Sequence, residues 1–413
     1  MKILVLNSGS SSQKSALYEV QDAIPKHPLQ PIWKGTIEWD GAQGKLKSSD
    51  SHGTIRKTQI HVSSRKQAVE AMLDSISNGE RGAISSLSEI NVVGHRIVHG
   101  GRDYQRPTII TPEVQETLRR LAIFAPLHNR AELEGIQIVQ KRLGPLPQVG
   151  VFDTAFHSQM PEPAFVYPGP HEWLAQGIRR YGFHGINHQY CAERAAQLLN
   201  RELSSLRIVT CHLGSGCSLA AIQNGHSIDT TMGFTPLEGL MMGTRSGSVD
   251  PGILIYLMRQ KRHNPEELDQ LLNTKSGLLG ISGTSGDMRE IESAMKQRHE
   301  RARLAFDVFL HYLCRGIGAM VAVLGGIDVL VFTAGIGENS AAVRTSACKS
   351  LRYLGLRLDA RKNLSSTEDR QISTTDSQVR ALVIHAQEEW TIARECWRLL
   401  SASYGNRASA TVS

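Results

Sequence analysis

The chain has 413 residues, of which 40% are hydrophobic and 21% are charged, as in ordinary globular proteins of two or three domains. That composition excludes a largely disordered or fibrous chain. The 46 basic residues exceed the 39 acidic ones by 7, a surplus too small for this length to favour a nucleic acid over an anionic small molecule as the ligand.

The six cysteines are scattered, and no two of them form a Cys-x-x-Cys pair. This spacing argues against a disulfide scaffold or a structural zinc site and fits a reducing compartment. The first residues hold only four consecutive apolar residues after one lysine, which is too short for a signal peptide. Since no run of about 20 apolar residues follows, we expect a cytoplasmic protein that binds neither membranes nor nucleic acid.

Two similar hairpins are predicted, each near the start of one half of the chain. Residues 2–6 read as a buried strand that passes through a Gly/Ser turn into a strand over 13–20. The same layout returns as a strand over 207–212, a turn at 213–216 and a strand over 217–222. The spacing indicates an internal duplication. The polar residues 26–66 between the two hairpins are expected to form a peripheral insertion of short strands.

The later elements alternate between helix and strand. Thr111 is a plausible helix N-cap, since Pro112 follows at the first helical position. A long apolar periodicity predicts a helix over 301–324. A buried strand over 328–333 is expected to run into a glycine-rich turn at 335–339, with a helix from about Ser340. This alternation predicts an α/β fold.

Three Gly/Ser turns that follow buried strands are the main clue to a ligand, because glycine lets the backbone approach an anion closely. The chain has no G-x-x-x-x-G-K-[ST] motif, lacks the third glycine of a dinucleotide fingerprint, and lacks the protein-kinase motifs. A pair of phosphate hairpins on two similar halves remains. That arrangement is typical of the actin-like nucleotide fold, in which ATP lies in a cleft between the halves.

Several polar residues stand where chemistry is plausible. Arg96 lies in a glycine-bounded apolar strand and suits a carboxylate or phosphate, or else pairs with a structural acid. Asp153 ends an apolar strand, where it binds a metal, orients a substrate or caps a helix. His184 lies in a turn and is a donor for a phosphoryl oxygen, and His188, four residues on, makes a metal pair conceivable. Arg245 lies in a glycine-bounded loop, where it either takes part in the chemistry or is an ordinary surface arginine.

At two acidic positions the sequence leaves open whether the side chain binds a ligand or has an ordinary structural place. Asp287 fits either a nucleotide contact or an ordinary turn. Glu388 fits either Mg²⁺, which prefers oxygen ligands, or the solvated start of a C-terminal helix.

Together these segments resemble the acetate kinase family, and the matches run in the family's order from residue 7 to about 394. The matching segments are Asn7–Ser12, Gly94–Gly101, Ala125–Asn129, Val151–His157, Tyr181–Gly185, His212–Gly214, Met232–Gly239, Gly243–Gly247 and Gly335–Asn339.

The resemblance implies reversible, ATP-dependent phosphorylation of acetate to acetyl phosphate by direct in-line transfer, with Mg²⁺ or alternatively Mn²⁺. It implies a homodimer and an actin-like (ribonuclease-H-like), duplicated two-domain α/β fold with an interdomain cleft. Residues 1–153 with 389–413 would form the acyl-substrate and Mg²⁺ domain, and 154–388 the nucleotide-binding domain. The alternatives are a propionate or other short-chain acyl kinase, and a non-catalytic actin-like nucleotide-binding protein.

The resemblance also implies roles for individual residues. The catalytic residues would be Arg96, Asp153, His184 and Arg245. The substrate, including the methyl group, would meet Arg96, Val98, Leu127, His128, Phe183 and Pro236. The ATP phosphates would meet Lys14, His212, Leu213, Gly214, Ser215 and Gly216. The adenosine would meet Asp287, Met288, Arg289, Gly335, Ile336, Gly337, Glu338 and Asn339. Asn7 and Glu388 would hold the Mg²⁺ ion.

The chemistry agrees with these roles, because phosphoryl transfer needs alignment and cations more than covalent help. Acetate, with an acid pKa of about 4, is already ionised at neutral pH and needs no general base. Asp153 is therefore expected to orient the acetate or the Mg²⁺ shell rather than to take a proton.

The sequence departs from the family pattern at a few positions. Ser215 stands where asparagine is usual, and Arg130 where proline is usual. Ile186-Asn187-His188 replaces Thr-Ser-His, and Gln387 replaces asparagine. The Arg, Asp, His and Glu positions of the expected site are all present, so we expect activity, with a change in nucleotide or acid preference as the open question.

Overall fold

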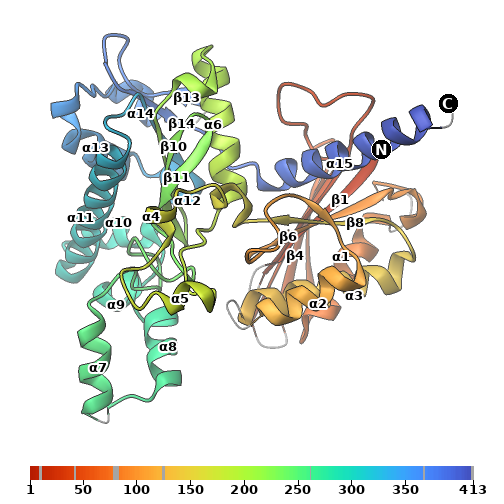
Figure 1. Cartoon of the computed structure of the whole chain (residues 1–413), viewed down its shortest axis with the longest axis horizontal. Helices are drawn as coiled ribbons and strands as arrows, with labels where there is room; N and C mark the ends of the chain where they lie inside the picture. The colour runs from red at the N-terminus through yellow and green to blue at the C-terminus, as the bar shows by residue number, and fades with distance from the viewer. Residues whose placement is uncertain are drawn as a thin grey trace. The chain divides into compact units, whose positions relative to one another are not determined.

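The computed structural model describes residues 1–8, 12–40, 43–77, 83–122, 126–260, 262–365 and 368–410 (Figure 1). The chain forms two compact units. Unit 1 contains Met1–Ala155 and the C-terminal segment from Gln387, and unit 2 contains Phe156–Ala386. The domain boundaries expected from the sequence lie at 153 and 389. The structure differs at the second boundary, because Glu388 belongs to unit 1.

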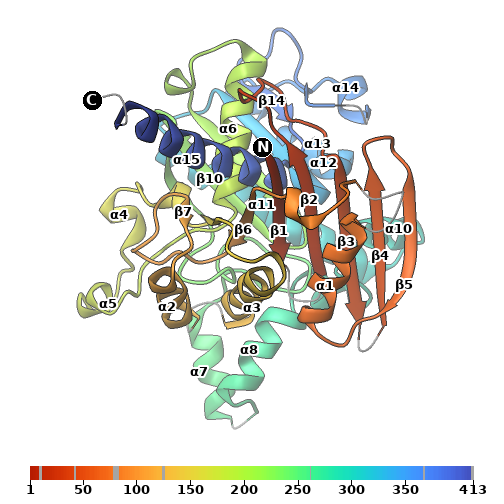
Figure 2. The same ribbon diagram turned by 90° about the vertical axis from the view of Figure 1, so that its right-hand side faces the viewer.

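Unit 1 is built on an eight-stranded sheet with the order β5-β4-β3-β2-β1-β6-β8-β7. Its strands are β1 (Lys2–Ser8), β2 (Ser12–Glu19), β3 (Trp33–Asp40), β4 (Gln43–Asp50), β5 (Ile55–His61), β6 (Val92–Ile97), β7 (Thr108–Ile109) and β8 (Gln148–Phe152). Strands β1 to β5 are antiparallel neighbours, while β6 and β8 run parallel to β1. Figure 2 shows β1 to β5 side by side in this order.

Helices cover both faces of this sheet (Figure 1). The helices of unit 1 are α1 (Arg65–Ser77), the 3₁₀ helix η2 (Leu87–Glu89), α2 (Pro112–Leu121), α3 (Pro126–Leu143) and α15 (Glu388–Ala410). Alternating strand residues such as Leu4 and Leu6 pack with Met72 of α1 in one buried core, while α15 contacts the sheet opposite. Thr111 caps α2 as predicted, since its side chain accepts from the Val114 N–H.

Unit 2 is built on a six-stranded sheet with the order β11-β10-β9-β12-β14-β13. Its strands are β9 (Ile208–Leu213), β10 (Cys217–Gln223), β11 (His226–Thr230), β12 (Val329–Thr333), β13 (Arg370–Gln371) and β14 (Arg380–Val383). Here β9, β10 and β11 are antiparallel, and β12 and β14 run parallel in the direction of β9.

The two sheets therefore share one topology: three antiparallel strands ordered third, second, first, followed by two strands parallel to the first. This repeat confirms the predicted internal duplication. It also corrects the interpretation of residues 26–66 as a peripheral insertion, because β3 is the counterpart of β11 and belongs to the repeat. Beyond it, unit 1 adds β4 and β5 at one edge of its sheet, and each unit adds a short antiparallel strand at the other edge, β7 in unit 1 and β13 in unit 2.

Helices also cover both faces of the second sheet. They are α4 (Glu162–Phe165), α5 (Glu172–Ala175), α6 (Gly185–Leu199), α7 (Pro251–Arg259), α8 (Pro265–Thr274), α9 (Gly277–Ser282), α10 (Met288–Lys296), α11 (Glu300–Val323), α12 (Ala334–Asn339), α13 (Ala341–Ser350) and α14 (Ala360–Leu364), with 3₁₀ turns η3 (Ala155–His157), η4 (Leu203–Ser205) and η5 (Arg352–Leu354). Helix α6 packs on β9 and β12, and α11 packs on β9 and β10 from the other face.

The predicted glycine-rich turn at 335–339 is instead the short helix α12, which begins directly after β12. Its first residue, Ala334, has a left-handed backbone (φ 64°), and its N–H is bound by Glu338 Oε1 at 2.8 Å. The carboxylate of Glu338 thus satisfies an N–H group that the helix cannot pair internally. This local cap explains why the segment is helical.

Among the described residues, α11 is the helix long and apolar enough to span a membrane. Its large apolar residues Phe306, Phe309 and Ile317 are buried, and the helix contacts β9, β10 and α9. Polar residues occupy the other side, among them Arg303 and Asp307. This is the pattern of an amphipathic helix that packs one face on a sheet.

Candidate functional site

Three polar side chains of unit 1 meet at the carboxyl ends of neighbouring parallel strands. The β1–β6 register pairs Leu6 with His95, so Asn7 lies beside Arg96, and Asp153 directly follows β8. Arg96 Nη2 donates to Asp153 Oδ2, and Arg96 Nη1 donates to Asn7 Oδ1 at 3.3 Å. The structure thus brings together three of the predicted residues, and the acid that partners Arg96 is itself one of them.

This cluster is buried but charged. The Asp153 side chain is only 1% exposed and that of Arg96 15%. Burial alone would lower the pKa of Arg96, yet the charges of Asp153 and Glu388 raise it above its usual value, so the guanidinium stays protonated. A buried ion pair is costly to desolvate and is weak evidence for stability, which leaves ligand binding as the better reason for it.

Asn7 also faces the first turn of α15. Its Nδ2 donates to Glu388 Oε2 at 3.2 Å and to Glu389 Oε1 at 3.3 Å. The carboxylates suit this helix N-terminus, where the backbone dipole favours negative charge. Among the residues that the structure describes, no group of three or more His, Cys, Asp and Glu side chains is placed to hold a metal. Mg²⁺ does not require one, since one or two carboxylates with water and phosphate suffice.

One buried acid of unit 1 was missed by the sequence analysis. Glu132 on α3 is 2% exposed, and its Oε1 accepts the Val98 N–H at 3.0 Å. Burial raises the pKa of Glu132 to about 8, although the Val98 hydrogen bond and the charge of Arg96 oppose the rise. The signal was available, because Glu132 falls on the apolar stripe of α3 beside Ile136, where a carboxyl is rarely placed without a reason.

Other residues predicted for the substrate lie in both units. Val98 is buried just after β6, with 4% exposure. Leu127 and His128 are in the first turn of α3, and their side chains lie outside the described residues. In unit 2, Phe183 is buried and Pro236 is half-buried. Lys14 is exposed on β2 and lies opposite Asn7 in the β1–β2 ladder.

In unit 2, two histidines stack beside the β9–β10 hairpin. The rings of His184 and His212 are 4.0 Å apart and nearly parallel, with an interplanar angle of 10°. His184 is the N-cap of α6 and has a left-handed backbone (φ 59°), an uncommon state for a residue with a side chain. Such strain often marks functional positions. Its Nδ1 is bonded to Ser218 Oγ at 2.8 Å.

The hairpin backbone comes very close to His184 and Arg245 at Gly216. A Cβ added at Gly216 would lie 3.3 Å from His184 Nε2 and 3.6 Å from Arg245 Nη1. Arg245 is held in place by a hydrogen bond of 2.9 Å from Nη1 to the Pro236 carbonyl. His184, Arg245 and the glycine hairpin, which are far apart in sequence, therefore present their donors to one place in unit 2.

A cavity of about 700 Å³ opens next to this hairpin. Its lining includes eight of the predicted nucleotide residues: Gly214, Ser215, Asp287, Met288, Arg289, Gly335, Ile336 and Asn339. Asp287 also caps α10 and pairs with Arg289, which confirms the turn interpretation of that segment, while its nucleotide contact stays a prediction. The volume suits a ligand of nucleoside size.

Some predicted nucleotide residues lie elsewhere, and some lining residues were not predicted. Gly337 packs against β12, where an added Cβ would be 3.3 Å from the Phe332 carbonyl carbon. Glu338 is used as the cap of α12, and the Leu213 side chain is fully buried. The further lining residues are Gly243, Thr244, Gly286, Glu292 and Ser340. Gly243 and Thr244 belong to the matching segment Gly243–Gly247, and Gly286 directly precedes Asp287, whereas nothing in the sequence marked Glu292 or Ser340 as ligand-binding.

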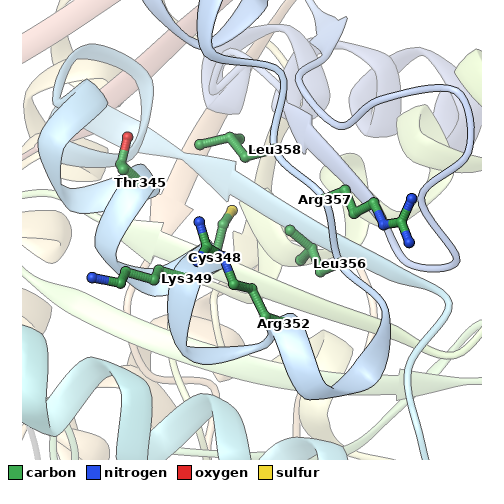
Figure 3. A pocket seen from close by; sticks show the side chains of 7 residues that line it. All are labelled: Thr345, Cys348, Lys349, Arg352, Leu356, Arg357 and Leu358. Carbon is green, nitrogen blue, oxygen red and sulfur yellow. The ribbon is translucent and has the colours of Figure 1, made fainter.

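A second cavity of unit 2, of about 400 Å³, lies where α13 and η5 meet the segment up to Leu358 (Figure 3). Lys349 and Arg352 line it beside the buried Cys348, and Arg357 on the other side pairs with Asp376. It contains none of the residues predicted for catalysis or ligand binding.

The duplicated sheet, the glycine hairpin and the adjoining cavity define a phosphotransferase of the actin-like fold. A sequence profile described as the acetokinase family matches residues 2–394. The chain therefore belongs to the acetokinase family and is a kinase.

Named relatives agree with this membership. The acetate kinase of Gloeobacter violaceus is 57% identical, over 97% of this chain and 100% of its own length, and that of a Nostoc species is 55% identical over the same shares. The crystal structure of Porphyromonas gingivalis acetate kinase has a TM-score of 0.88 at 41% identity, covering 97% of this chain and 99% of its own. That of a propionate kinase from Francisella tularensis has a TM-score of 0.86 at 37% identity, covering 95% and 98%.

Proposed function

We propose that the chain transfers the γ-phosphoryl group of ATP to the carboxylate of acetate, forming acetyl phosphate in a reversible reaction. Family membership and the names of the full-length relatives support ATP and acetate as substrates. The observation that carries the proposal is the approach of His184 and Arg245 to the glycine hairpin at Gly216, beside a nucleoside-sized cavity. Phosphoryl transfer needs such donors around the equatorial oxygens.

Unit 2 binds ATP, the phosphoryl donor. The cavity lined by Asp287 and Ile336 takes the adenosine, which directs the phosphates toward the hairpin at Gly214 and Gly216. Without a side chain at Gly216, the phosphates can meet backbone N–H groups directly. Arg245 and His184 donate to the transferring phosphoryl group and offset the charge that develops on its oxygens.

Unit 1 binds acetate, the phosphoryl acceptor. Arg96 binds the acetate carboxylate, since a guanidinium matches two carboxylate oxygens. Asp153 holds Arg96 in position through its hydrogen bond. Acetate is already ionised, so Asp153 takes no proton and acts as an orienting group. Val98, directly after the Arg96 strand, provides apolar contact for the methyl group.

Asn7 and Glu388 would hold the Mg²⁺ ion, with Glu389 within reach of the same amide. Their oxygen donors fit this ion, which keeps several waters and binds through few carboxylates. When bound, Mg²⁺ neutralises phosphate charge and orients the phosphates for in-line transfer. Mn²⁺ shares the preference for oxygen ligands and is expected to substitute.

Propionate is a second candidate acceptor, because one similar structure is that of a propionate kinase. The two acids differ by one methylene, which is worth only about 1–3 kcal/mol in an apolar pocket. We therefore expect both acids to react, with acetate preferred.

We also propose that the enzyme is a cytoplasmic homodimer and that a second copy covers α7. This helix exposes Ile253, Ile255, Tyr256 and Met258, each at least 42% exposed, whereas soluble monomers rarely expose so continuous an apolar face. Replacing Tyr256 by glutamate should convert a dimer to a monomer in light scattering. An unchanged mass for the variant would place the interface elsewhere.

The proposed reaction is tested by incubating the protein with ATP, Mg²⁺ and acetate, propionate or butyrate, and trapping the product with hydroxylamine. We expect the hydroxamate of acetate, and less of that of propionate. Omitting Mg²⁺ should abolish the product, and Mn²⁺ should restore part of it. If none of the acids gives a hydroxamate, the proposed activity is wrong.

A further inference from the structure

Helix α6 places three polar side chains on one buried face. His184 precedes its first residue, and Asn187 and His188 follow at the third and fourth positions, a spacing that aligns side chains on a helix. Asn187 and His188 are fully buried. Each of the three bonds a residue of the adjacent strands, so the face is a hydrogen-bond network rather than an apolar contact.

The first part of this network is a chain of three hydrogen bonds that ends at His184. Thr210 Oγ1 lies 2.7 Å from His188 Nδ1, and His188 Nε2 lies 2.7 Å from Ser218 Oγ. Ser218 Oγ lies 2.8 Å from His184 Nδ1. Ser218 has one hydroxyl proton and two nitrogen neighbours, so it donates to one and accepts from the other.

The direction of this chain follows from its far end. The Thr210 hydroxyl is fully buried, and among the described residues its one hydrogen-bond partner is His188 Nδ1. If His188 donated to Thr210, the Thr210 proton would be buried without an acceptor, which is unfavourable. Thr210 therefore donates, His188 carries its proton on Nε2, and Ser218 donates to His184 Nδ1. The ring proton of His184 is then on Nε2.

A separate contact fixes His212 in the same way. Asn187 Nδ2 lies 2.9 Å from His212 Nδ1 and also donates to Thr333 Oγ1 at 3.3 Å. An amide nitrogen is a donor only, so His212 Nδ1 accepts and its proton is on Nε2. That nitrogen would lie 3.9 Å from a Cβ added at Gly214, which places it toward the hairpin.

We propose that Asn187 and the Thr210–His188–Ser218 chain are positioning residues that set the tautomers of the stacked pair His184 and His212, so that both rings present an Nε2–H donor to a phosphate oxygen at the hairpin. The inference rests on the proposed function and deepens it, because it assigns two neutral donors to the phosphoryl site. Burial lowers the pKa of His188 far below its usual value, which keeps that ring neutral, as the chain requires.

The tautomers are measured directly by ¹⁵N NMR of the histidine rings of the full-length protein, with His184 and His212 assigned by substitution with glutamine. We expect His184, His188 and His212 all to be protonated on Nε2. Protonation of His184 on Nδ1 would overturn the chain, and protonation of His212 on Nδ1 would overturn the role of Asn187. This test needs no activity, so it stands even if the protein phosphorylates none of the acids tried.

Kinetics of two variants at Asn187 distinguish positioning from packing. Asn187→Asp keeps the shape but offers His212 only acceptors, so its proton must move to Nδ1. Asn187→Ala removes the donor without reversing it. In mildly alkaline buffer we expect kcat to fall roughly 10²-fold or more for the aspartate variant, as when a transition-state donor is lost, and clearly less for alanine, with the acetate KM unchanged.

A purely structural role predicts the opposite order, since aspartate is the closer match in size. That order, or equal activities, would overturn the positioning role. Ser227→Ala is the matched control, because it removes a buried bond to His157 outside the network and should leave the His184 tautomer unchanged. If the aspartate variant does not fold, the NMR result on the unaltered protein decides.

Discussion

The carboxyl edge of the sheet in unit 1 and the hairpin edge of the sheet in unit 2 have the same topology and opposite chemistry. In unit 1, charged side chains at strand ends bind one another, as Arg96 does Asp153. In unit 2, the corresponding edge presents glycine backbone and histidines held by Ser218 and Asn187. The duplicated fold thus fixes where polar groups gather, while the residues decide whether that place suits a carboxylate with its metal or a phosphate.

The largest expected effect comes from removing the arginine that unit 2 presents near the glycine hairpin. Arg245→Ala should lower kcat by roughly 10³–10⁵-fold, as for other arginines that stabilise a transferring phosphoryl group. Arg352→Ala, which removes an exposed arginine of the second cavity, is the matched control. Steady-state rates measure both. A loss in Arg245→Ala below tenfold would remove this residue from the phosphoryl site.

In unit 1, where charged side chains pair with one another, we predict that a single substitution weakens both the stability of the fold and acetate binding. Asp153→Asn deprives the buried Arg96 of its carboxylate, so unfolding by urea should show a loss of about 3 kcal/mol or more, with a raised acetate KM. Asp376→Asn removes an exposed carboxylate paired with Arg357 and should leave the stability nearly unchanged, because exposed ion pairs contribute little. Equal losses in the two variants would contradict the assigned roles.

A smaller effect, on ATP kinetics, is expected at Gly216, where unit 2 presents backbone rather than a charged side chain. Gly216→Ala puts a methyl group 3.3 Å from His184 Nε2, in the space that we assign to the phosphate. We expect kcat/KM for ATP to fall roughly tenfold to a hundredfold, since misplacing a reacting group by about 1 Å has this order of effect. Gly318→Ala, which meets nothing within 4 Å on α11, serves as the control. Unchanged ATP kinetics would move the phosphate away from Gly216.

The smallest effect concerns Glu132 of unit 1. Burial raises its pKa to about 8, so between about pH 5 and 8 the folded state holds a proton that the unfolded state releases, and stability falls as pH rises. Over this range the free energy of unfolding of the wild type should fall with pH more steeply than that of Glu132→Gln, by up to about 1.4 kcal/mol per pH unit. Urea unfolding at several pH values tests this. A variant with the wild-type slope would show that Glu132 is ionised throughout.

Much of the fold followed from the sequence, because buried strands and turn residues carry strong local signals. The hairpins at residues 2–20 and 207–222, the N-cap at Thr111 and the helix over 301–324 all depend on neighbours in sequence. The helix over 334–339 was missed because its start requires a left-handed Ala334 capped by Glu338, which no periodicity reveals.

The candidate site was predictable only in part. Arg96, Asp153 and His184 were recognisable because polar residues beside buried strands are unusual. Glu132 was missed because its burial depends on how α3 packs, and the network behind His184 because Thr210 and Ser218 are ordinary strand residues until the third dimension joins them. Residues that act through another group leave the weakest trace in a sequence.

The division of labour between the units is tested most directly by measuring nucleotide affinity and acetyl phosphate formation in the Arg96→Ala variant. The division of labour predicts that ADP without metal binds within about twofold of wild type, because the cavity assigned to the adenosine is in unit 2, while acetate-dependent turnover falls by several orders of magnitude. Loss of nucleotide affinity together with turnover, or turnover near the wild-type rate, would contradict it.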